Sequence, residues 1–144
     1  MRLDDRDDLY QDHVLAHYED PFHRGHCPRA THAHEDDNPL CGDRVRIELE
    51  VDDAGQVQSA YFNGQGCCIS QAAASMLCER CEGCHIDELR KFTAPEMLKL
   101  FGAPLTPNRQ KCCLLGWRVI QSALYSPIAA GEADEQTTNE QASA

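Results

Sequence analysis

Three cysteines and one aspartate are the residues of this chain best suited to hold a metal. They are Cys41, Asp43, Cys67 and Cys112, in the segments 38–43 (NPLCGD), 64–70 (GQGCCIS) and 107–113 (PNRQKCC). Thiolates and carboxylates are common zinc ligands, and thiolates also hold iron–sulfur clusters. We therefore expect the fold to bring these four side chains together around one metal ion or one small cluster.

The first segment supplies two of these groups. In extended backbone, residues two apart project to the same side, so Cys41 and Asp43 could address one point. Gly42 between them lets the backbone bend and another group approach closely. Asn-Pro and Gly-Asp are also ordinary turn sequences, so an incidental thiol in a turn remains an alternative for this segment.

The other two cysteines are each expected at the amino end of a helix, Cys67 after a Gly-Gln-Gly sequence and Cys112 after Pro107. Unpaired amides and the positive end of the helix dipole favour thiolate there. Two basic residues close to Cys112 would add to this effect: Arg109 and Lys111. The cysteines that follow directly in sequence, Cys68 and Cys113, are assigned to packing.

A second set of cysteines, Cys78, Cys81 and Cys84, has C-x2-C-x2-C spacing. This spacing resembles part of a ferredoxin-type cluster motif, but the fourth position, 88, is glutamate. If Cys78 and Cys81 continue the preceding helix, they share one face and pack there, which we favour; a second metal site is the alternative. A redox protein that uses these three thiols is a weaker hypothesis.

A loop with one cysteine and three histidines is the remaining candidate metal site: Cys27, His26, His32 and His34. Its spacing matches no regular zinc motif, so we favour a solvated loop over a zinc site.

Composition restricts the class of protein. A chain of 144 residues forms one domain, and its net charge of −11, from 24 acidic and 13 basic residues, disfavours nucleic acid as a partner. The charged start does not resemble a signal peptide, and no apolar stretch could span a membrane. We therefore expect a cytoplasmic protein, in which the nine cysteines stay reduced.

Apolar periodicity predicts the following elements: a helix over 7–18, a loop over 21–38, strands over 44–51 and 57–62 joined by a turn, and helices over 69–81, 87–92, 93–102 and from 108 onward. Two glycines, Gly64 and Gly66, are expected to end the second strand. Helices on one face of a small antiparallel sheet make an α+β domain over 1–127. Residues 128–144 are expected to be a disordered tail.

The three segments in this order resemble the signature segments of the IscU/SufU/NifU amino-terminal superfamily of iron–sulfur cluster assembly proteins. The similarity covers most of the chain, from Leu9 to Tyr125, and includes residues 17–21 (HYEDP). It implies a three-stranded antiparallel sheet, and hence a third strand that periodicity does not reveal.

The resemblance also implies roles for individual residues. It makes Cys41, Asp43, Cys67 and Cys112 the metal or cluster ligands, and it places Arg109 beside the site. In SufU-like members these ligands hold zinc, and the residue matching Cys41 accepts sulfur from a cysteine desulfurase. In IscU-like members they assemble a [2Fe–2S] cluster and pass it to downstream assembly proteins.

The subgroup is predicted from a few positions. Lys111 before the third cysteine and Trp117 resemble SufU, and residues 105–111 (LTPNRQK) lack the chaperone-binding motif of IscU. The stretch between Cys67 and Cys112 is too short for the insertion typical of SufU. We expect a zinc-dependent sulfur carrier that acts with a desulfurase rather than as a stand-alone enzyme. The alternatives are an IscU-type scaffold and a non-catalytic, zinc-stabilised interaction domain.

Overall fold

The computed structural model describes residues 12–39 and 42–128. Of the predicted amino-terminal helix, residues 12–19 are helical and 7–11 lie outside the described part. The predicted tail also lies outside it, except Ile128, whose N–H donates to the carbonyl of Thr31 at 2.8 Å. Among the residues described, no helix is both long enough and apolar enough to cross a bilayer.

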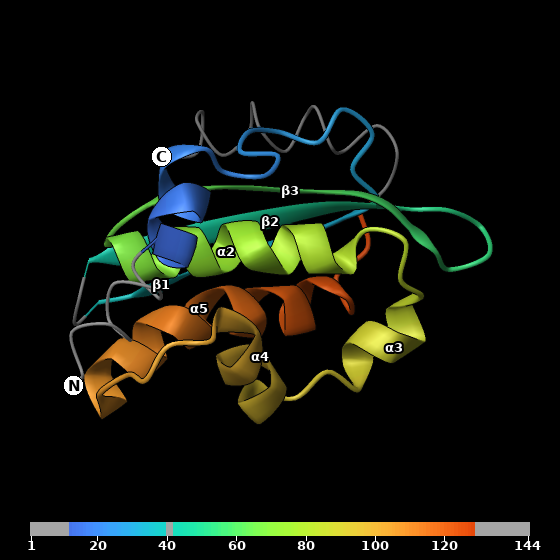
Figure 1. Ribbon diagram of the computed structural model, residues 1–144. Helices are drawn as coiled ribbons and strands as arrows, with labels where there is room; N and C mark the ends of the chain where they lie inside the picture. Colours follow the sequence, from blue (N-terminus) through green and yellow to red (C-terminus); the bar gives the residue numbers. More distant parts are fainter. Residues whose placement is uncertain (1–11, 40–41, 129–144) are drawn as a thin grey trace.

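A three-stranded antiparallel sheet organises the fold, in the order β1-β2-β3 (Figure 1). The strands are β1 (His32–Asn38), β2 (Asp43–Val51) and β3 (Val57–Gln65). The alternation predicted for the central strand is present, because Val45, Ile47 and Leu49 are fully buried on the face that the helices cover. The predicted hairpin of β2 and β3 is confirmed, with Ile47 paired to Phe62.

The prediction of a loop over 21–38 is wrong for its second half, which forms the edge strand β1. The strand pairs with β2 from His32 opposite Leu49 to Asn38 opposite Asp43. Periodicity missed it because Ala33 is the one buried apolar residue among the seven. The third strand that the resemblance implied is therefore β1.

The prediction that Gly64 ends the second strand is also wrong, because β3 continues through it to Gln65. Gly64 lies opposite Val45, with φ of +154°. A Cβ atom here would lie 2.9 Å from the carbonyl carbon of Arg44. Glycine therefore allows close approach of two strands at this position, which is another common use of glycine in a sheet.

In the described part of the chain, four further helices follow the sheet in sequence: α2 (Cys68–Cys81), α3 (Ile86–Arg90), α4 (Ala94–Phe101) and α5 (Pro107–Ala123). The predicted capping box of α4 is present, with Thr93 and Glu96 bonded reciprocally and Gly102 left-handed after the last turn.

The helices cover one face of the sheet, with α2 along β3 and α5 along β1 and β2 (Figure 1). This arrangement confirms the predicted α+β class. A chain segment anchored by Cys27 covers part of the opposite face, where the Cys27 N–H donates to the buried Glu48 carboxylate at 2.8 Å. The core thus lies between the sheet and the helix layer.

Gly116 lies where α5 packs closely on α2, and we predict that Gly116→Ala stabilises the fold. An added Cβ would lie 3.6 Å from the Cα of Ala74, an ordinary van der Waals distance. Alanine in a helix interior gains up to about 1 kcal/mol over glycine. Urea denaturation should show a higher midpoint at an unchanged slope.

The control is Gly116→Val, whose extra methyl groups would press on Ala74 and should destabilise by about 1–3 kcal/mol. Equal stability of the two variants would contradict the close packing of these helices.

Candidate metal centre

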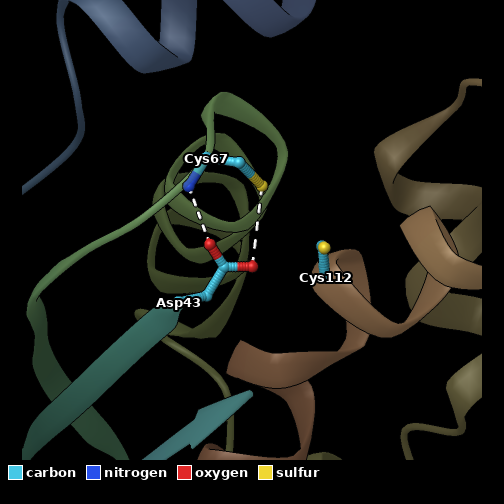
Figure 2. A group of neighbouring side chains, drawn as sticks. All are labelled: Asp43, Cys67 and Cys112. Atoms are coloured by element: carbon cyan, nitrogen blue, oxygen red, sulfur yellow. Dashed lines mark hydrogen bonds between the residues drawn. The ribbon is translucent and has the colours of Figure 1, made fainter. Parts of the chain in front are cut away.

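One group of potential metal ligands stands out in the described part of the chain. Asp43, Cys67 and Cys112 each offer a ligand atom, and these atoms all lie within 4.8 Å of one another. Figure 2 shows the three side chains converging from the start of β2, the start of α2 and the first half of α5. The structure therefore brings together three of the four side chains that the sequence singled out.

Asp43 is fully buried at the first position of β2, where it pairs with Asn38 of β1. Its Oδ1 accepts a 2.7 Å hydrogen bond from the backbone N–H of Cys67 (Figure 2). Gly66 makes this contact possible, because a Cβ there would lie 2.8 Å from the Cα of Asp43 and closer still to Oδ1. The sequence predicted Gly66 only as the end of a strand. The available signal for its role beside Asp43 was its position directly before Cys67.

Cys67 is the N-cap of α2, as predicted. Its backbone is extended, with φ of −72° and ψ of 163°, and its sulfur accepts a hydrogen bond from the Ser70 N–H at 3.4 Å. The thiol also contacts Asp43 Oδ2 at 3.6 Å. The side chain is half-buried, so it is more accessible than Asp43.

Cys112 is not at a helix amino terminus, which corrects the prediction. The N-cap of α5 is Thr106 and Pro107 is the first helical residue, so Cys112 lies in the second turn. The influence of the helix dipole fades within the first turn, so the expected electrostatic benefit does not apply. Cys112 is 4% exposed, whereas Arg109 and Lys111 are exposed on the helix surface.

Cys41 lies outside the described residues, and so its position relative to the group is not part of the structure. The prediction that Cys41 and Asp43 project to the same side requires an extended backbone between them. Gly42 has φ of +72°, so the backbone turns there, and its N–H donates to the carbonyl of Asn38 at 2.9 Å. The predicted extended backbone is therefore wrong at Gly42.

The cysteines assigned to packing are mostly buried. Cys78, Cys81 and Cys113 are fully buried in the core between the sheet and the helices. Burial raises the pKa of the Cys113 thiol to about 12 and raises the pKa of the Cys78 thiol well above its ordinary value. Cys68 is only half-buried at the edge of the same core.

Neither alternative metal site forms a three-ligand group in the described part of the chain. Cys27 is buried, with its sulfur 3.5 Å from the Ser59 hydroxyl, and His26 contacts Glu48 at 3.2 Å. The other two histidines of that candidate, His32 and His34, belong to β1. The favoured prediction of a solvated loop is therefore also wrong for this segment, since it covers the sheet.

One pair of ligand atoms in the group has the spacing expected around a tetrahedral zinc ion. With a zinc–sulfur bond of about 2.3 Å and a zinc–oxygen bond of about 2.1 Å, the sulfur and oxygen lie about 3.6 Å apart. The Cys67 sulfur and the Asp43 Oδ2 are 3.6 Å apart. The donor set of two sulfurs and one carboxylate oxygen leaves room for a fourth ligand.

Comparison with known proteins gives consistent matches. Residues 9–129 match the family described as NifU-like N terminal domain. The iron–sulfur cluster assembly scaffold protein IscU of Thermotoga maritima is 33% identical over 132 residues, which cover 81% of this chain and 92% of that protein. The zinc-dependent sulfurtransferase SufU of Bacillus subtilis is 29% identical over 140 residues, covering 82% and 90%.

A solved structure supports the fold. The amino-terminal part of a nitrogen-fixing NifU-like protein from Brucella abortus superposes with a TM-score of 0.66 at 24% identity, over 83% of this chain and 94% of that one. The match over residues 9–129 and the 33% identity to the Thermotoga maritima protein show that the chain belongs to the NifU-like N-terminal domain family.

Proposed function

We propose that this chain is an iron–sulfur cluster assembly protein that accepts sulfur from a cysteine desulfurase at a zinc site. The ligands of that site are Cys41, Asp43, Cys67 and Cys112. The observation that carries the proposal is the convergence of the last three within 4.8 Å, from three separate elements. A cytoplasmic location, where thiols stay reduced, is part of the proposal.

Chain geometry supports Cys41 as the fourth ligand. Its Cα lies two residues before that of Asp43, and therefore no more than about 7.6 Å from it. Asn38 and Asp43 are paired across the two strands, so both ends of the intervening connection are held beside the group. Because the connection is so short, it limits how far the Cys41 thiol can lie from the three described ligand atoms.

Bound zinc would supply the positive charge that keeps the cysteine thiols deprotonated. The protein supplies the orientation. The carboxylate of Asp43 is fixed by the Cys67 amide, and the Cys67 sulfur is fixed by the Ser70 amide. A carboxylate ligand makes the site more exchangeable than an all-thiolate one, which suits a site with a reactive cysteine.

The reaction we assign to Cys41 is transfer of one sulfur atom. Its thiolate attacks the outer sulfur of the persulfide on the desulfurase, so that a sulfur–sulfur bond forms at Cys41. The sulfur–sulfur bond on the desulfurase breaks, and the desulfurase cysteine leaves as a thiolate. The proton on the outer sulfur stays on that sulfur atom, which becomes the outer sulfur of a persulfide on Cys41, and no other oxidant or reductant is required.

A scaffold function is the second candidate, because relatives of both kinds match this chain. One match is named a cluster assembly scaffold and the other a zinc-dependent sulfurtransferase. In this alternative the same four side chains hold iron and sulfide as cargo and release a [2Fe–2S] cluster to downstream assembly proteins.

The first test replaces the proposed sulfur acceptor. We predict that Cys41→Ala accepts no more sulfur from a desulfurase than a reaction without acceptor, since the nucleophile is gone. Sulfur-35 transfer from labelled cysteine, resolved by mass spectrometry of the acceptor, measures this. Undiminished labelling of Cys41→Ala protein would show that Cys41 is not the sulfur acceptor.

Two further variants make this test specific. Cys68→Ala removes a half-buried thiol outside the ligand group and should leave transfer intact. Asp43→Ala should lower both zinc content and sulfur transfer. A zinc-stabilised interaction domain would instead show only lower thermal stability in Asp43→Ala protein.

The second test uses two glycines with nearly the same φ angle. Gly66→Ala should weaken zinc binding about tenfold or more, because its Cβ would displace the Asp43 carboxylate. Gly25→Ala is the control: its φ of +144° resembles the +148° of Gly66, but a Cβ there would meet nothing within 4 Å. Competition with a chromophoric chelator measures affinity, and equal losses in both variants would rule out the proposed support of Asp43.

The third test separates carrier from scaffold. Anaerobic incubation of the protein with iron, cysteine and a desulfurase should leave zinc in place and yield persulfide, without a stable visible chromophore. A [2Fe–2S] absorption spectrum that passes to an apo-ferredoxin would support the scaffold function instead. Elemental analysis of the freshly purified protein provides the starting metal content for either outcome.

A further inference from the structure

A second pair of cysteines lies at the carboxyl end of α2, in the turn Cys81-Glu82-Gly83-Cys84. Glu82 has φ of −64° and ψ of 132°, Gly83 has φ of +87°, and the Cys84 N–H donates to the Cys81 carbonyl at 3.0 Å. These values define a type II β-turn, whose third residue needs positive φ and is usually glycine. The two cysteines therefore occupy the first and fourth positions of a tight turn.

This spacing suits a disulfide. The Cα atoms of the first and fourth residues of a β-turn lie less than about 7 Å apart. Disulfides join cysteines whose Cα atoms are about 4.4–6.8 Å apart. The backbone of the turn is therefore compatible with a disulfide between Cys81 and Cys84, which also needs their two Cβ atoms to face each other.

The two thiols differ in environment. Cys84 is half-exposed, and its sulfur accepts a hydrogen bond from the Arg80 guanidinium at 3.3 Å. The Arg80 guanidinium is also placed over the Phe92 ring, 5.4 Å from its centre, so its position is supported from a second side. Cys81 is fully buried, and burial raises its pKa above the ordinary value of a thiol. Cys84 is thus the thiol that a small reagent meets first.

The pair is separate from the candidate metal centre. Cys67 caps the amino end of α2 and Cys81 is the last residue of that helix, fourteen residues in length. At about 1.5 Å per residue, the two ends are about 20 Å apart. Among the described residues, Cys81 and Cys84 belong to no group of three potential metal ligands.

We propose that Cys81 and Cys84 form a redox-active dithiol that exchanges with low-molecular-weight disulfides. The Cys84 thiolate attacks one sulfur of the small disulfide, forms a mixed disulfide and releases one small thiol. Cys81 then gives up its proton and attacks the Cys84 sulfur, which releases the second small thiol. The two protein thiols are oxidised by two electrons, and the small disulfide is reduced to two thiols.

Neighbouring hydrogen bonds hold this turn in the conformation that the exchange requires. The Gly83 N–H donates to the Val57 carbonyl, and the Val57 N–H donates to the Cys84 carbonyl, both at 2.9 Å. The Glu82 carboxylate accepts from the Ala60 N–H at 3.0 Å. The start of β3 therefore fixes the turn, so the oxidised protein should keep its fold.

The test is peptide mapping of the full-length protein after incubation with oxidised glutathione. Free thiols are then alkylated under denaturing conditions, and trypsin cleaves after Arg80 and Arg90 so that both cysteines fall in residues 81–90. We expect this peptide to lack two hydrogens and to carry no alkyl group, while Cys78 is alkylated. A peptide with glutathione on Cys84 and alkylated Cys81, or with both cysteines alkylated, would overturn the proposal.

Three variants sharpen the result. Cys81→Ala should trap the mixed disulfide at Cys84, whereas Cys78→Ala, which removes an equally buried thiol one turn earlier, should behave as wild type. Arg80→Gln should slow the reaction of Cys84 several-fold, and an unchanged rate would remove Arg80 from its role. If Cys81→Ala fails to fold, peptide mapping of the wild-type protein decides alone.

Discussion

The hydrogen bond between the Asp43 carboxylate and the Cys67 amide is the contact on which the candidate site depends. It joins the first residue of β2 to the N-cap of α2 at a distance of 2.7 Å. The Asp43 side chain that accepts it is fully buried from solvent. A buried carboxylate is costly unless it is bonded, so this contact both satisfies Asp43 and sets where α2 begins. Gly66 allows it, since any larger residue would occupy the place of the carboxylate.

Much of the fold could be predicted because apolar spacing and caps were explicit in the sequence. The alternation in β2 and the capping box before α4 correspond to the elements observed. The strand β1 could not be found in this way, because an edge strand with charged residues at 35–37 carries little apolar pattern. The pairing of β1 with β2 depends on tertiary structure rather than on local sequence, and only the family resemblance indicated a third strand.

The candidate site was predictable in its residue types and less so in its geometry. Cys67 at a helix start follows from local sequence, and it is observed as the N-cap. Cys112 was placed wrongly because a helix that begins at Pro107, as observed, or at Asn108, as predicted, already has Cys112 beyond its first turn. The burial of Asp43 also could not be read from a Gly-Asp dipeptide, since it results from the packing of α2 against β2.

Unequal burial within the ligand group bears on how sulfur would reach it. Asp43 and Cys112 are almost wholly enclosed, while Cys67 is half-buried. Of the three described ligands, Cys67 is therefore the one that another protein can reach from solvent. On the proposed function, Asp43 and Cys112 hold the metal ion from enclosed positions, and the reacting thiol is that of Cys41. Burial of a carboxylate and a thiol is costly unless they are bonded, so the enclosed positions of Asp43 and Cys112 fit ligands that hold an ion.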